Sequence, residues 1–197
     1  MRVLVLGGSG NFGARIVDAL QGDPTVELLV ASRRGAPVPG MDAVHPVVLD
    51  MEAPDFCARL TALNPGLVIH CVGPFQGQDY RVVQAALASG AHYLDLADGR
   101  DFVARFPAAN DAAARAADRI ALSGASTLPA LSSAVIDALC GPLQMVDRIE
   151  LAIAPGQRAP RGVATSAAVF SYLGRPIPVW RNGQWKRVWG WMDLRRL

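Results

Sequence analysis

The fold is decided by the stretch Val3-Leu4-Val5-Leu6-Gly7-Gly8-Ser9-Gly10-Asn11-Phe12-Gly13 near the start of the chain. Its apolar run predicts a buried parallel strand, because the run is short, continuous and ends at glycines. Phe12, Ile16 and Leu20 then recur at a spacing of four, which predicts a helix. A strand, a Gly-x-Gly-x-x-Gly loop and a helix in this order are typical of a dinucleotide-binding unit.

Strands and helices alternate along most of the chain that follows. Helical spacing is expected over 55–63 and 80–89, and Pro107 is expected to start a helix over 108–117 because proline favours the first turn. This alternation implies βαβ units, so the predicted fold class is α/β with a doubly wound, mostly parallel Rossmann sheet. The expected strands cover 3–6, 28–31, 44–49, 67–72, 93–96 and 120–122.

Each glycine of the loop has a predicted role. Gly8 is expected to permit the tight turn, Gly10 to let the backbone approach a pyrophosphate, and Gly13 to let helix and strand pack closely. The amides near Asn11 and Phe12 would then face the phosphates at the positive end of the helix. The alternative is a glycine turn that binds no ligand.

The residues after the second strand bear on the choice of cofactor. An NAD site would have Asp or Glu there to bind the ribose 2′-hydroxyl. This chain has Ser32, Arg33 and Arg34, with no carboxylate between Leu28 and Met41. Guanidinium groups suit a 2′-phosphate by charge and by geometry, so NADP is the predicted cofactor. The alternative is a pair of solvated surface arginines.

Further candidates follow the later strands, because ligands of open α/β sheets lie outside the carboxyl ends of the strands. Asp50 could accept from the adenine amino group or cap the next turn. Val72, Gly73 and Pro74 are expected beside the nicotinamide ribose, although Gly-Pro also marks ordinary turns. Asp95 is a candidate catalytic acid or base, or else a hydrogen-bonded structural carboxylate.

These segments resemble the saccharopine dehydrogenase-like family of NADP-binding oxidoreductases. The resemblance spans most of residues 1–140. It implies an NADP-dependent hydride transfer to or from a small substrate, which it leaves unidentified. Members of that family usually continue well past 197 residues into a catalytic domain built on a mixed sheet, so the resemblance also implies that this chain is a fragment. The residues that carry it are the glycine loop, 72–75, 90–95, Gly124 and 129–133.

The composition changes near residue 147, where we place a domain boundary. Residues 148–197 carry nine basic and two acidic side chains and all four tryptophans. A strand over 148–154, a helix over 165–173 and a hairpin turn at Asn182-Gly183 are expected there. Residues 1–147 are thus predicted to be the NAD(P)-binding domain, and 148–197 the partial start of an α+β domain that could form a homodimer.

Other functions are less well supported by the residues. A non-catalytic NADP-binding sensor or interaction module stays the alternative, because no proton donor is obvious. Nucleic-acid binding by the basic, tryptophan-rich tail is disfavoured, since charge runs are usually solvated faces. Metal-ligand motifs, long apolar runs and a signal-peptide core are absent from the sequence. We therefore expect no metal and no membrane association, and a cytoplasmic location.

Overall fold

The computed structural model describes residues 1–35, 44–154, 156–159 and 162–192. The chain forms two compact units, Met1–Pro160 and Arg161–Leu197, which are described separately. The domain boundary near residue 147 stays a prediction. Within the described residues, no helix combines the length and the apolar character needed to cross a membrane.

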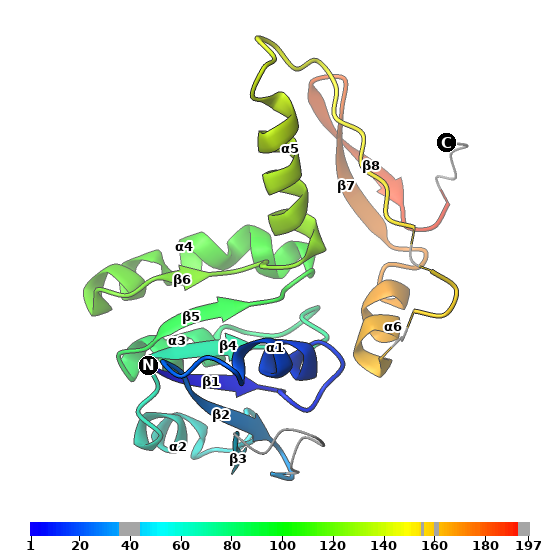
Figure 1. The fold of residues 1–197 in the computed structure, drawn as a ribbon. Coiled ribbons are helices and arrows are strands. Elements are labelled where there is room, and N and C mark those ends of the chain that lie inside the picture. Colours follow the sequence, from blue (N-terminus) through cyan, green and yellow to red (C-terminus); the bar gives the residue numbers. More distant parts are fainter. Residues whose placement is uncertain (36–43, 155, 160–161, 193–197) are drawn as a thin grey trace. The chain divides into compact units, whose positions relative to one another are not determined.

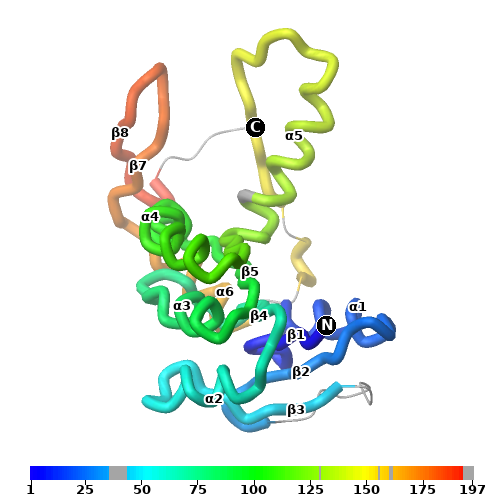
Figure 2. Tube along the Cα trace, turned by 90° about the vertical axis from the view of Figure 1, so that its left-hand side faces the viewer, coloured from blue at the N-terminus to red at the C-terminus, as the bar shows by residue number. Residues whose placement is uncertain are grey.

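The first unit is built on a six-stranded parallel sheet with the order β3-β2-β1-β4-β5-β6 (Figure 1). Figure 2 shows β5, β4, β1, β2 and β3 following one another across the sheet, in the order that the strand pairing gives. This is the order of a doubly wound Rossmann sheet, so the predicted fold class is confirmed. The strands are β1 (Arg2–Leu6), β2 (Glu27–Ser32), β3 (His45–Val48), β4 (Leu67–His70), β5 (His92–Asp95) and β6 (Ala121–Leu122).

Side-chain alternation along β1 divides the apolar core between the two faces of the sheet. Val3 and Val5 pack with Val17 of α1 (Gly13–Leu20) on one face. Leu4 and Leu6 belong to the cluster on the other face. That cluster includes buried residues of α2 (Phe56–Ala62), α3 (Arg81–Ala88) and α4 (Arg100–Ala117). Both faces of β1 are therefore buried, as its continuous apolar run predicts.

Helix α4 corrects one sequence-based expectation. It begins at Arg100, so Pro107 lies inside the helix and not at its start. A proline in a helix interior removes a hydrogen bond and crowds the preceding turn. The helix continues because Phe102, Phe106 and Asn110 recur every four residues and are all buried. Burial of this stripe outweighs the local cost of the proline.

The rest of the first unit exposes many apolar side chains. The short helical segment η1 (Thr127–Leu131) leads into α5 (Ser132–Cys140), which has no buried residue. The strand expected over 148–154 is wrong, since these residues form neither helix nor strand. Their alternation cannot define a strand by itself, because a strand also needs a hydrogen-bonding neighbour.

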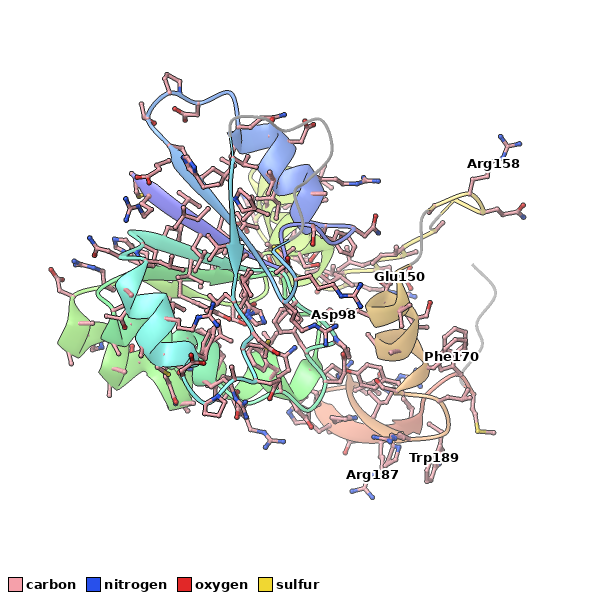
Figure 3. All side chains as sticks on the ribbon, turned by 90° about the horizontal axis from the view of Figure 1, so that it is seen from below. Asp98, Glu150, Arg158, Phe170, Arg187 and Trp189 are labelled. Carbon is pink, nitrogen blue, oxygen red and sulfur yellow. The ribbon has the colours of Figure 1, made fainter. Side chains whose placement is uncertain are left out.

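The second unit contains a helix and a hairpin. Helix α6 (Val163–Phe170) precedes the antiparallel strands β7 (Pro176–Arg181) and β8 (Gln184–Trp189). Asn182 and Gly183 join them with positive φ angles of 52° and 73°, so the predicted hairpin turn is confirmed. Phe170 and Trp189 are exposed within this unit (Figure 3). Residues 193–197 of the predicted second domain lie outside the described residues.

Candidate functional site

The candidate site lies where the sheet reverses its strand order, between β1 and β4. The carboxyl ends of the parallel strands share one edge of the sheet (Figure 1). The loops after β1 and β4 meet there, because the Cys71 amide donates to the Leu6 carbonyl at 2.8 Å. Ligands of open α/β sheets bind at such a switch point. The topology therefore brings the glycine loop and the Val72–Pro74 turn to one crevice.

The first two glycines of the loop, Gly7 and Gly8, meet different structural requirements. The tight turn is made by Gly7, whose φ is +80° and whose amide donates to the Ala31 carbonyl at 2.8 Å. Gly8 instead lies against the core, where an added Cβ would come within 2.7 Å of Val30 Cγ1 and 3.2 Å of Val17 Cγ2. Gly8 also lies within the turn that the Gly10 amide closes onto the Gly7 carbonyl at 2.9 Å, so its role in permitting the turn stays a prediction. Glycine is needed at that position for close packing.

Gly10 and Gly13 are glycines for different reasons: Gly13 for the packing of α1 against the loop, and Gly10 for space beside the loop. A Cβ on Gly13 would lie 2.3 Å from the Gly7 carbonyl oxygen, so only glycine lets α1 start this close to β1. A Cβ on Gly10 would meet that same oxygen at 3.1 Å and nothing else within 4 Å. Space on the open side of the loop at Gly10 is what a bound pyrophosphate requires.

The start of α1 also fits an anion. Asn11 and Phe12 are exposed directly before the helix. The first turn of α1 carries no acidic side chain, so nothing there opposes the positive end of the helix dipole. The loop and the helix start therefore fit the pyrophosphate of a dinucleotide.

Ser32, Arg33 and Arg34 lie at the end of β2. The Gly35 amide donates to the Ser32 carbonyl at 3.4 Å, which closes a turn with both arginines in the middle. Both arginines are exposed, and neither forms an ion pair with a residue in the described ranges. The buried Ser32 hydroxyl likewise has no hydrogen-bond partner among these residues. Three donors that fit a phosphate thus share one strand end.

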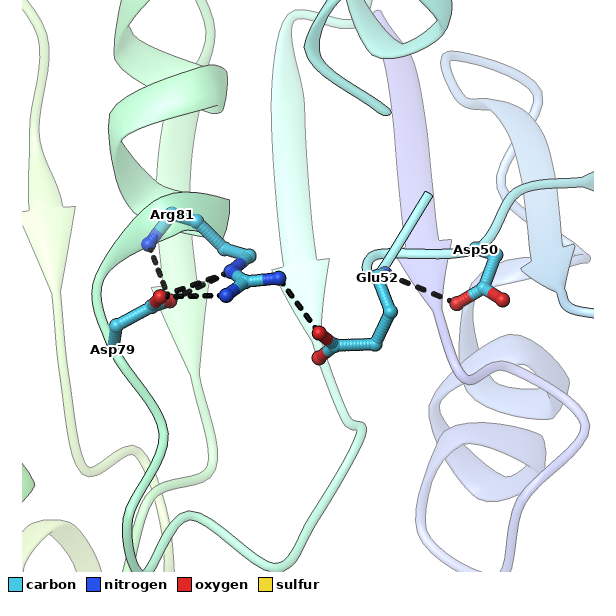
Figure 4. A network of polar contacts seen from close by, with 4 residues as sticks. All are labelled: Asp50, Glu52, Asp79 and Arg81. Atoms are coloured by element: carbon cyan, nitrogen blue, oxygen red, sulfur yellow. Dashed lines mark hydrogen bonds and ion pairs between the residues drawn. The ribbon is translucent and has the colours of Figure 1, made fainter. Parts of the chain in front are cut away.

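Asp50 follows β3 at the same edge of the sheet. Its Oδ1 accepts the Glu52 amide at 3.1 Å, so it caps the turn, one of its two predicted roles. Arg81 at the start of α3 donates from Nη1 to Glu52 Oε2 at 2.6 Å. Its Nε and Nη2 donate to the Asp79 carboxylate (Figure 4). This network ties the loop after β3 to α3.

The turn after β4 contains Val72, Gly73 and Pro74, joined by a cis Gly73–Pro74 peptide bond. Val72 contacts the glycine loop, since a Cβ on Gly7 would lie 2.8 Å from Val72 Cγ2. Sequence reasoning missed Gln78, whose side-chain amide donates to the carbonyls of Val72 and Pro74, both at 2.8 Å. Its position just after the Gly-Pro turn was the signal available.

Asp95 is fully buried at the end of β5 and is held by four donors. Oδ1 accepts the amides of Ala97 and Gly124 and the Ser123 hydroxyl at 2.8–2.9 Å, and Oδ2 accepts the Tyr93 hydroxyl at 3.1 Å. Burial raises the pKa of this carboxyl, and the hydrogen bonds oppose that shift. The geometry matches the structural alternative, in which Asp95 ties the ends of β5 and β6 together.

Two neighbouring side chains are uncharged at neutral pH. Burial lowers the pKa of His70 to about 3. Burial, with Asp95 nearby, raises the pKa of the Cys71 thiol to about 12. A thiol with so high a pKa is a poor nucleophile, so Cys71 has the character of a packing residue.

Residues 3–135 match the family model described as the saccharopine dehydrogenase NADP-binding domain. No curated protein matches the chain in a sequence search. Among solved structures, the chain is similar to the apo L-Glu-forming saccharopine dehydrogenase of Saccharomyces cerevisiae, with 17% identity and a TM-score of 0.50 over 70% of this chain and 31% of that one.

Two other solved structures are similar to part of the chain. One is the WlbA dehydrogenase of Thermus thermophilus, with 17% identity and a TM-score of 0.46 over 62% of this chain and 41% of that one. The other is the ADP-L-glycero-D-manno-heptose-6-epimerase of Helicobacter pylori, with 14% identity and a TM-score of 0.39 over 48% of this chain and 38% of that one. The chain spans less than half the length of each of these three proteins. The family match over residues 3–135 shows that this chain belongs to the saccharopine dehydrogenase family and contains its NAD(P)-binding Rossmann domain.

Proposed function

We propose that the first unit binds NADP(H) in preference to NAD(H). The observation that carries this proposal is the end of β2, where Arg33 and Arg34 are exposed without an acidic partner in the described ranges and the Ser32 hydroxyl is unpartnered there. A 2′-phosphate would give all three groups an anionic acceptor. The pyrophosphate would bind at Gly10 and the start of α1.

The bound cofactor would supply hydride transfer, and the protein would bind and orient it. Adenosine would lie on the β2–β3 side of the switch point and nicotinamide on the β4–β5 side, beside Val72, Gly73 and Pro74. In this proposal the whole protein is an NADP-dependent oxidoreductase acting on an unidentified small substrate. In this proposal Asp95 holds the ends of β5 and β6 together, because it is buried and accepts hydrogen bonds from Ser123 and Gly124.

The test is a fluorescence titration of the chain with NADPH and NADH. We expect NADPH to bind more tightly, and Arg33→Ala to remove most of that preference. Loss of a charge-assisted phosphate contact costs about 1.5–3 kcal/mol, which is about tenfold or more in affinity. Arg105→Ala on α4 is the control, because it removes another exposed cation, one that pairs with Asp101. Equal affinities of the unaltered chain for NADPH and NADH would refute the preference.

A non-catalytic NADP-binding sensor is the second candidate. The observation favouring it is that Asp95 is buried and accepts four hydrogen bonds from its own strand ends, while the Cys71 thiol, with a pKa raised to about 12, is a poor nucleophile. Turnover of NADPH with imine or enone substrates by the full-length protein would distinguish the two functions.

We also propose that residues 148–197 mediate a homodimer. The second unit exposes Phe170 and all four tryptophans, and its two-stranded sheet has no third strand among the described residues. Isolated hairpins are marginally stable, and large exposed apolar side chains favour association.

A further inference from the structure

The turn after β4 is held by two side chains, those of Gln78 and His70. Gln78 Nε2 donates to the Val72 and Pro74 carbonyls at 2.8 Å each. His70 Nε2 lies 3.1 Å from the same Val72 oxygen. The Gln78 backbone amide also donates to the Phe75 carbonyl at 3.3 Å, which folds the segment back under the turn. One glutamine thus binds three carbonyls of the loop that precedes it.

His70 must use Nε2 as its donor, because the Val72 carbonyl can only accept. The ring is 1% exposed and lies tilted against Phe75 and Tyr93, with ring centroids 5.0 and 6.3 Å away. Nδ1 has no partner among the described residues. The neutral ring is therefore a single fixed donor. With Gln78 it occupies both lone pairs of the Val72 oxygen.

These bonds set the direction of the Gly73 amide. The carbonyl and the amide hydrogen of one trans peptide point in opposite directions, so holding the Val72 oxygen toward Gln78 directs the Gly73 N–H away from it. Pro74 has no amide hydrogen, so at the Gly73–Pro74 step only Gly73 can donate a backbone N–H. No hydrogen bond of that amide is seen within the described residues.

We propose that Gln78 is a positioning residue for the nicotinamide half of the cofactor. It holds the Val72–Pro74 turn against Gly7 with the Gly73 amide free to donate to the ribose or carboxamide of that half. This inference rests on the proposed function. It predicts that loss of Gln78 affects the β4 side of the crevice and leaves the β2 side unchanged, because Arg33 belongs to another loop on the opposite side of β1.

The test compares the whole cofactor with its adenosine half in the full chain. Gln78→Glu replaces the donor with a carboxylate that repels both carbonyls, and Gln78→Met removes the donor without adding charge. We expect NADPH to bind about tenfold more weakly to Q78E and about threefold more weakly to Q78M. The affinity for 2′,5′-ADP, measured by calorimetry, should change less than twofold. Gln84→Glu is the matched control, because Gln84 is exposed on α3, and it should change neither affinity.

Other results of these titrations would refute either the positioning role of Gln78 or the proposed function. Unchanged NADPH binding in both Gln78 variants would refute the positioning role. Equal losses for NADPH and 2′,5′-ADP would also refute it, because the effect would not be confined to the nicotinamide half. Failure of the unaltered chain to bind either ligand would refute the proposed function itself. Circular dichroism and thermal melting identify a variant that fails to fold. If one Gln78 variant does not fold, the NADPH affinity of the other one tests the positioning role.

Discussion

His70 should make the stability of the Rossmann domain depend on pH. Its ring is buried, and its pKa is lowered from 6.5 to about 3 by that burial. Below pH 6.5 the unfolded chain takes up a proton at this residue and the folded chain does not. The contribution of His70 to stability is therefore fully present above pH 6.5 and is lost as the pH falls toward 3. At pH 5 the loss is about 2 kcal/mol, from 1.5 pH units at about 1.4 kcal/mol each.

Urea denaturation at pH 7, 6 and 5 measures this effect. His70→Gln is the matched variant, because glutamine keeps a donor for the Val72 carbonyl and does not titrate. Carboxylates with lowered pKa values, such as those of Asp23 and Asp79, also make the folded protein less stable in acid. They are present in both proteins, so their effect on the two pH profiles is the same. We expect the unaltered chain to lose about 2 kcal/mol more than H70Q between pH 7 and pH 5. Equal losses of unfolding free energy in the unaltered chain and in H70Q between pH 7 and pH 5 would refute the reasoning, because His70 would then take up its proton in the folded protein as well.

The remaining predictions concern the glycine loop and the tail. Gly13→Ala should lower the free energy of unfolding by about 1–3 kcal/mol in thermal denaturation, because its Cβ would lie 2.3 Å from the Gly7 carbonyl oxygen. Gly10→Val should abolish NADPH binding in calorimetry with an unchanged circular dichroism spectrum, and retained affinity would mean that the loop is only a turn. By light scattering, the full chain should be a dimer and a version ending at Pro142 a monomer. If both are monomers, residues 148–197 are not a dimer interface.

The parallel sheet could be predicted from the sequence because its central strands β1, β2 and β4 are buried on both faces. Such strands appear as continuous apolar runs, and the helices between them show their own spacing. The error at Pro107 has a physical origin. Proline is a strong local signal, but the buried stripe of Phe102, Phe106 and Asn110 needs the sheet as a partner before it stabilises the helix. Local rules could not weigh that tertiary contact.

The cofactor loop shows a different limit. The spacing of the glycines identified the loop, but it did not say which glycine has a positive φ. Gly7 precedes the motif and makes the turn, whereas Gly8 is needed for contact with Val30 and Val17. Those contacts come from β2 and α1, so they exist only after the βαβ unit has formed. The glycine loop and its place between β1 and α1 were thus predictable, and the packing contacts of its separate glycines were not.

Asp95 shows why a carboxylate at a strand end is ambiguous in sequence. At the carboxyl end of a parallel strand it can face the crevice or bind the neighbouring strand, and its residue type is the same in both cases. What distinguishes them here is the end of β6, where the Ser123 hydroxyl and the Gly124 amide both donate to Asp95. Gly124 has a φ of +82°, a conformation that glycine adopts without strain. A carboxylate after one strand and Ser-Gly after the next therefore indicate a tie between adjacent strand ends, and a search for the catalytic proton donor should begin elsewhere in the protein.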